Sequence, residues 1–296
     1  GLDRVEEEEA SAGDIVAFSG LEAPKISDTI CDPQSVEALP ALVVDEPTIS
    51  MTFETNNSPL FGQEGKFVTS RQLRERLLRE MLSNVALRVE EADDPDRFVV
   101  FGRGELHLGI LIENMRREGY ELAVSRPRVV VKEDGGQKLE PWEQLTVDVE
   151  ATAQGAVMEA LGARGAELVD MVPDGKGRVR LDYRIPSRGM IGFQTEFRTM
   201  TSGTGLMYHV FDRFDPVVDK SLAERTAGVM ISNGRGPVLA YALFNLQERG
   251  KLFVGPGDLV YEGQIVGETA REGDMVVNPL KGKKLTNIRT QSKDEN

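Results

Sequence analysis

The 296-residue sequence contains only one cysteine, Cys31, and two histidines, His107 and His209. A single thiol cannot close an internal disulfide, and three such side chains offer almost no ligands for a structural metal site. We therefore expect a reducing, cytoplasmic environment and no bound metal. The sequence also lacks the run of about 18 apolar residues of a membrane helix, and its acidic start lacks the features of a signal peptide. These absences predict a soluble protein that is not exported and has no membrane partner.

The motifs of nucleotide hydrolysis and of nucleophilic catalysis are absent as well. No GxxxxGK[ST] string, which would cradle phosphates, occurs in the chain, and neither does a G-x-S-x-G nucleophile elbow. Asp93 and Asp94 lie in a turn-rich stretch, where paired carboxylates are usually solvated. We therefore predict that this chain has no catalytic residue and no cofactor-binding residue, and that it is not itself an enzyme.

The formal net charge of -14 argues against a nucleic-acid partner unless basic residues gather locally, because screening confines surface electrostatics to about 10 Å. They gather between Met275 and Lys293, a stretch without Asp or Glu. Its basic residues are Lys281, Lys283, Lys284, Arg289 and Lys293. Pro, Gly, Asn and Ser make this stretch typical of a loop, which predicts an RNA-binding basic segment. The alternative is a C-terminus that only improves solubility.

Hydrophobic periodicity predicts the same β-α-β-β-α-β order twice, which is the ferredoxin-like arrangement. The first copy begins near Pro47, with Ser70 as the expected N-cap of its first helix and Gly119 as the end of its second. A linker containing Gly135 and Gly136 leads to the second copy. Arg-Gly pairs at 103 and 188 precede the second helix of each copy, at an offset of 85 residues. The fold class is therefore α+β with tandem ferredoxin-like domains.

The flanking segments are predicted to be β-rich. A strand at Ile15 to Phe18, between Gly13 and Gly20, indicates the end of a β-domain. After about residue 214, alternation at 240–244 and at 259–266 between frequent glycines predicts strands of a small barrel or sandwich.

The run from Ser187 to Asp215, SRGMIGFQTEFRTMTSGTGLMYHVFDRFD, resembles the BipA/TypA translational GTPases, relatives of elongation factor G. The resemblance extends over the whole chain and includes EPTISMTFETNNSPLFGQEGKF, GRGELHLGILIENMRREGYEL and GKKLTNIR. It implies that residues 1–40 end a β-barrel domain II, 41–131 are domain III, 132–215 are domain V, and 216–296 are the family's own C-terminal domain. No large domain IV separates the two repeats, which fits both BipA and the related factor LepA.

The resemblance also implies a function. The chain is expected to bind the 70S ribosome, ribosomal RNA and the acceptor end of tRNA in the A site through the basic segment, and to act as a monomer. Arg188 and Arg198 in the second repeat are further candidates for RNA contact. GTP is expected in a G domain outside this chain, so that the parent protein is a GTPase linked to stress, cold growth and ribosome assembly. Two alternatives stay open: a LepA-like elongation factor, and a small-molecule-sensing protein built from tandem ferredoxin-like domains.

Overall fold

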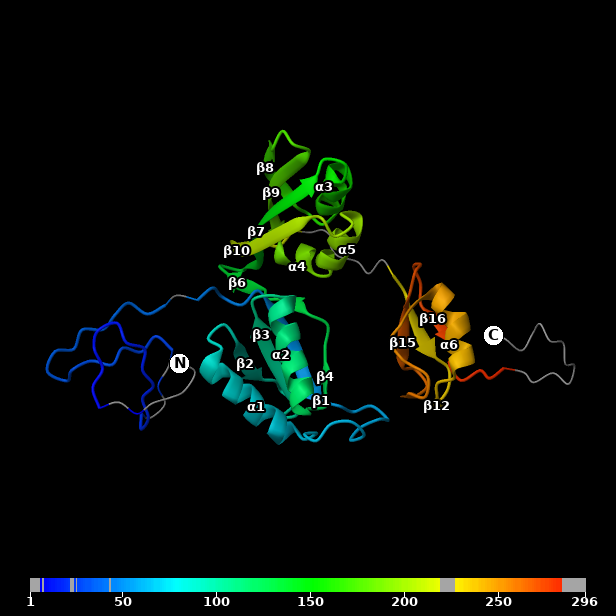
Figure 1. Cartoon of the computed structure of the whole chain (residues 1–296), viewed down its shortest axis with the longest axis horizontal. Helices are drawn as coiled ribbons and strands as arrows, with labels where there is room; N and C mark the ends of the chain where they lie inside the picture. The colour runs from blue at the N-terminus through cyan, green and yellow to red at the C-terminus, as the bar shows by residue number, and fades with distance from the viewer. Residues whose placement is uncertain are drawn as a thin grey trace, which may run out of the picture.

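The computed structural model describes residues 6, 8–21, 24, 26–42, 44–218 and 227–283. Two α+β units and a smaller C-terminal unit follow one another along the chain (Figure 1). Within the described residues no helix is long and apolar enough to cross a membrane.

The first ferredoxin-like unit has the predicted element order. Its elements are β1 (Ile49–Thr55), α1 (Ser70–Ser83), β2 (Arg88–Glu91), β3 (Arg97–Gly102), α2 (Glu105–Glu118) and β4 (Leu122–Val124). The antiparallel strands lie in the order β2-β3-β1-β4, and the short β5 (Arg128–Val129) also pairs with β1. The edge strands β2 and β4 are the last strands of the two β-α-β halves, as a split βαβ arrangement requires. The strand order therefore confirms the predicted fold class.

The core of this unit follows the period of each element. Phe53 of β1 and Phe98 of β3 are fully or almost fully buried, opposite each other in the antiparallel register. Leu77 of α1 and Leu108 of α2 pack onto the same cluster. Alternate strand positions and one stripe of each helix therefore share one core, which fixes both helices on the sheet.

The ends of the two helices are set by local side-chain chemistry. The N-cap of α1 is Thr69, whose hydroxyl accepts the Gln72 N–H while the Gln72 side chain reaches back to the cap backbone. The prediction of Ser70 as N-cap was wrong by one residue, because only Thr69 has glutamine three positions later to complete a capping box. Gly119 ends α2 with a φ of 96°, as its position predicted.

The second ferredoxin-like unit repeats this topology. Its elements are β6 (Lys132–Asp134), β7 (Gln137–Glu150), α3 (Gln154–Ala163), β8 (Glu167–Pro173), β9 (Arg178–Pro186), α4 (Ser187–Met190), α5 (Phe193–Met200) and β10 (Leu206–Pro216). The strand order is β10-β7-β9-β8, with β6 added beside β7. Leu145, Leu181 and Phe193 are almost fully buried in its core. The tandem repeat predicted from the sequence is therefore confirmed.

A very short connection joins the two sheets. β5 belongs to the first sheet and β6 to the second, and only residues 130 and 131 lie between them. Gly135 and Gly136, expected to form the linker, instead form the turn of the β6–β7 hairpin with φ values of 56° and 84°. Two consecutive residues with positive φ are what a tight hairpin turn requires, so the glycines belong to the turn.

The C-terminal unit combines two small sheets with a helix. Its elements are β11 (Val229–Ser232), β12 (Gly236–Pro237), α6 (Ala240–Leu246), the 3-10 helix η1 (Gln247–Arg249), β13 (Gly250–Leu252), β14 (Leu259–Val260), β15 (Ile265–Thr269) and β16 (Met275–Val277). The larger sheet has the order β13-β15-β11-β16, and β12 pairs with β14.

Two of the predicted β-segments are not strands. Residues 240–244 belong to α6 and not to a strand, and the helix buries Ala242, Leu243 and Leu246. A short apolar run fits the period of a helix as well as that of a strand, so the sequence pattern could not decide between them. Ile15 to Phe18 form no strand either, and Ile15 is fully exposed. A strand needs a partner for its backbone groups, and none pairs with this segment among the described residues.

Candidate functional site

A cleft of about 770 Å³ lies between the two ferredoxin-like units. The first unit contributes the end of α1 and the start of α2, and the second unit contributes β7 and β10. Both histidines of the protein, His107 and His209, line it, together with the exposed apolar side chains of Leu106 and Ile110. A cleft of this size with an apolar lining and a few polar groups has the general character of a ligand site.

On the side of the first unit, His107 is held in one orientation by hydrogen bonds at both ring nitrogens. Nδ1 accepts the Arg103 backbone N–H at 3.3 Å, so the neutral ring carries its proton on Nε2, which lies 3.2 Å from Asn84 Oδ1. Burial, together with the nearby Arg103 charge, lowers the pKa of His107. The ring is therefore a neutral, fixed wall of the cleft.

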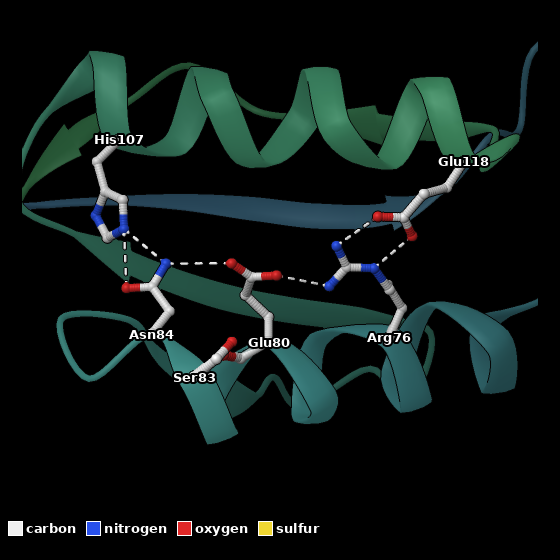
Figure 2. A network of polar contacts seen from close by, with 6 residues as sticks. All are labelled: Arg76, Glu80, Ser83, Asn84, His107 and Glu118. Atoms are coloured by element: carbon white, nitrogen blue, oxygen red, sulfur yellow. Dashed lines mark hydrogen bonds and ion pairs between the residues drawn. The ribbon is translucent and has the colours of Figure 1, made fainter. Parts of the chain in front are cut away.

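A chain of polar contacts runs from His107 along the helix interface to the far end of α2 (Figure 2). Asn84 Nδ2 donates to Glu80 Oε1 at 3.2 Å, and Glu80 Oε2 lies 2.7 Å from Arg76 Nη1. The Arg76 guanidinium also pairs with both carboxylate oxygens of Glu118, at 2.6 and 2.7 Å. The Arg76 side chain is only 8% exposed, and its pKa is raised, first by the Glu118 hydrogen bond. These contacts join α1 to α2 beneath the cleft.

On the side of the second unit, His209 of β10 pairs with Glu143 of β7. The two residues are separated by 2.5 Å between Nδ1 and Oε2, and the Glu143 side chain is only 6% exposed. The hydrogen bond to Glu143 raises the pKa of His209. The protonated form of this histidine is therefore held against the Glu143 carboxylate, whereas burial favours the neutral form of His107.

The predicted basic segment begins beside the C-terminal unit. Lys281 and Lys283 are exposed just after β16, and Lys284, Arg289 and Lys293 lie outside the described residues. The chain before Lys281 is anchored, because the Leu239 N–H donates to the Pro279 carbonyl at 3.0 Å. The segment therefore leaves a fixed point on the domain surface, and its RNA contacts stay a prediction.

The two predicted arginines of the second unit lie in different surroundings. Arg188 in α4 pairs with the buried Glu140 at 2.6 Å and also donates to the carbonyl of Val218. Its guanidinium thus ties α4 to β7, which is a structural role. Arg198 is exposed in the last turn of α5. The contact of either arginine with RNA stays a prediction.

Sequence comparison relates the whole chain to one group of proteins. Residues 227–296 match the TypA/BipA C-terminal domain, and residues 137–225 match the elongation factor G C-terminus. Proteins named large ribosomal subunit assembly factor BipA are 62% identical in Escherichia coli K12 and 61% in Salmonella typhimurium LT2, over 100% of this chain and 49% of each relative. The Haemophilus influenzae protein of the same name is 61% identical over 100% of this chain and 48% of its own length.

The chain belongs to the BipA/TypA family. It spans about half the length of the curated relatives it matches. The match over 227–296 separates this BipA/TypA chain from LepA-like factors, since it covers the family's own C-terminal domain. BipA/TypA proteins are related through the elongation factor match to the translational GTPases.

The cleft of this BipA/TypA chain has no counterpart in any local sequence pattern. His107 and His209 lie 102 residues apart in the sequence and reach the same cleft only because the two repeats pack against each other. A histidine at the start of one helix and another in the last strand carry no spacing signal that would connect them. The contact of His209 with Glu143, by contrast, is a diagonal one between two neighbouring strands, because the register places His209 opposite Leu145 and Glu143 opposite Phe211.

The His209–Glu143 pair predicts a pH-dependent stability of the second unit. The pKa of His209 is raised above 6.5 in the folded protein, so the folded state binds this proton more tightly than the unfolded state does. The protonated histidine therefore adds fully to the free energy of unfolding below pH 6.5. This contribution is lost as the pH rises through the pKa of the folded state. We expect His209→Gln to lower the urea midpoint most near about pH 6, and the difference from the wild type to shrink by about pH 9. Fluorescence of Trp142, which lies next to Glu143 in β7, reports this unfolding.

The matched control is His107→Gln in the first unit. The pKa of His107 is lowered, so its neutral ring favours folding above its unfolded pKa and this contribution is lost as the pH falls. The control should therefore show the opposite pH trend, measured by far-ultraviolet circular dichroism. A His209→Gln difference that stays constant over the whole pH range would contradict the assigned pair.

Proposed function

We propose that this chain is the ribosome- and RNA-binding half of a BipA/TypA-type translational GTPase. The observation that carries the proposal is 62% identity over the whole chain to proteins named large ribosomal subunit assembly factor. In this proposal the chain docks its parent protein on the large subunit and the 70S A-site region. The G domain that binds and hydrolyses GTP belongs to the parent protein, which acts in the cytoplasm as a monomer.

The proposal divides the chain by role. Residues 1–40 end domain II, 41–131 and 132–215 are domains III and V, and 216–296 form the family's C-terminal domain. The tandem ferredoxin-like units support a scaffold role, because each has its own packed core and a short connection fixes the junction between their sheets. The basic segment that leaves the C-terminal unit at Lys281 then supplies the contact with ribosomal RNA and the acceptor end of tRNA.

Binding to ribosomes over a salt series tests this proposal. We expect the full chain to co-sediment with 50S subunits and 70S ribosomes, and a Lys283→Ala, Lys284→Ala pair to bind at least about tenfold more weakly near 0.1 M salt. The slope of log affinity against log salt should become shallower by about 1.5, since each phosphate contact contributes roughly 0.7 to 0.9.

A matched pair, Lys176→Ala with Lys251→Ala, removes the same charge from exposed positions elsewhere. It should leave the slope close to that of the wild type. Equal slopes for both pairs would mean that only the total charge matters and would exclude the basic segment as the RNA contact. Failure of the wild-type chain to bind any ribosomal particle would refute the proposed function itself.

The cleft favours a second candidate function, in which the tandem units sense a small molecule. Its volume of about 770 Å³ suits a ligand of the size of an amino acid or larger. A saturable rise in thermal stability with a free amino acid, lost in His107→Gln, would favour this function. Ribosome binding without such a rise would favour the first.

A further inference from the structure

The C-terminal unit has a hollow of about 390 Å³ beside the point where the basic segment begins. One wall is formed by α6 and η1, and the other by the end of β16 and the residues that follow it, which lie close together in Figure 1. Tyr241, Asn245 and Arg249 line the first wall, and Val276 and Lys281 line the second. An aromatic ring, an amide and two cations thus face one small space.

The first wall is a helical stripe. Tyr241, Asn245 and Arg249 follow each other at intervals of four residues, which brings their side chains to one face. Leu243 and Leu246 of the same helix are buried in the core, which fixes the orientation of the stripe. Asn245 Nδ2 donates to the Tyr241 carbonyl at 2.6 Å, which leaves its amide oxygen and second N–H for other partners.

The hollow has two basic side chains and no acidic one among the described residues that line it. Arg249 is exposed, and its guanidinium lies 3.2 Å from the sulfur of Met275, which is a weak acceptor. In the part of the chain that the structure describes, no carboxylate lies among the residues that line the hollow. Arg180 and Arg213, by contrast, pair with aspartates two residues away. Two cations without a carboxylate among the described residues that line the hollow offer a local site for an anion.

The second wall is fixed in place. Leu280 packs on the core of the unit, and its N–H donates to Asn278 Oδ1 at 2.9 Å. Lys281 therefore extends from an anchored turn towards the hollow, and the remainder of the basic segment continues from there. A polyanion bound along the segment would pass the hollow.

We propose that this hollow binds one nucleotide of single-stranded RNA. The base stacks on the ring of Tyr241, which is 39% exposed, and the phosphate lies between Arg249 and Lys281. Asn245 supplies a donor and an acceptor for the base edge or the ribose. The inference rests on the proposed function as an RNA-binding chain and adds a folded subsite to the basic segment. Single-stranded rather than duplex RNA is specified, because only an unstacked base exposes its face to an aromatic side chain.

Binding of a fluorescein-labelled single-stranded heptanucleotide to the full chain tests the subsite. We expect Tyr241→Ala to weaken binding about tenfold without changing the salt slope, since stacking carries no charge. Tyr241→Phe should keep most of the affinity. Arg249→Ala should weaken binding and make the slope shallower by about 0.7, the value for one phosphate contact on a single strand. Tyr208→Ala, an exposed tyrosine of the second unit, is the matched control and should bind as the wild type does.

Parallel binding of each variant to 50S subunits and to deacylated tRNA identifies the source of the nucleotide, because Tyr241→Ala should weaken the complex with one of them. If ribosome binding depends on Lys283 and Lys284 while Tyr241→Ala and Arg249→Ala bind the heptanucleotide as tightly as the wild type, the subsite is refuted and the proposed function stands. Displacement of the RNA by duplex RNA or by a polyglutamate peptide at equal charge concentration would also refute it, since neither offers a free base.

Discussion

Replacing Arg188 by alanine is expected to destabilise the second ferredoxin-like unit by about 3 kcal/mol. Glu140, its partner at 2.6 Å, is only 1% exposed, so the substitution leaves a carboxylate charge buried without its cation. The Val218 N–H, which donates to Glu140 at 2.8 Å, cannot replace a guanidinium. Urea unfolding followed by Trp142 fluorescence measures the loss, because this tryptophan lies two residues beyond Glu140 in β7.

Two variants separate the lost ion pair from a general effect of removing arginine. Arg198→Ala, at an exposed position in α5, should change stability by less than about 0.5 kcal/mol. The double variant Glu140→Gln, Arg188→Met should be more stable than Arg188→Ala, because it buries no unpaired charge. An unchanged urea midpoint in Arg188→Ala would contradict a stabilising role of the Arg188–Glu140 pair. Weak ribosome binding by Arg188→Ala must therefore be interpreted only after this measurement.

Replacing Arg76 by methionine should lower the stability of the first ferredoxin-like unit by about 2 kcal/mol. The change leaves Glu80 and Glu118 near each other without the cation between them (Figure 2). The pKa of Glu118 is lowered mainly by its hydrogen bond to Arg76, so the pair favours the charged form of this carboxylate. Hydrogen exchange of the α1 and α2 amides should become about 30-fold faster, while amides of the second unit exchange as before.

The matched control on the same helix is Arg71→Met. Arg71 pairs with Glu75 four residues later, but its side chain is 88% exposed. A solvent-exposed pair of this kind contributes little, so exchange in α1 should change by less than about threefold. Equal effects of the two substitutions would mean that helix propensity, rather than the buried network, determines the result.

Most of the fold could be predicted because each repeat obeys local periodicity. Phe98 and Val100 alternate with less buried positions in β3, and Leu73 and Leu77 recur at helical spacing in α1. Residues 240–244 show where this reasoning fails, since a run of five apolar residues is compatible with the period of a strand and with that of a helix. The long-range packing that would have decided between helix and strand was not visible in the sequence.

The functional surfaces were harder to predict than the fold. The basic segment carries its own compositional signal, so the sequence alone predicts Lys281 and Lys283 as RNA contacts, and this stays a prediction. The stripe of Tyr241, Asn245 and Arg249 was hidden by the strand prediction, although a spacing of four residues would have revealed it on a helix. The cleft depends on how two separate domains meet, and no local pattern encodes that packing.

The two-residue connection between β5 and β6 has a mechanical consequence. Each of these strands is hydrogen-bonded into a different sheet, and the Val130 N–H is itself bonded to the Thr48 carbonyl at 2.9 Å. Such a joint can transmit torque, because there is no slack chain to absorb a rotation of one sheet relative to the other. A rotation of one ferredoxin-like unit would therefore change the shape of the cleft between the units, because no flexible linker is present to absorb it.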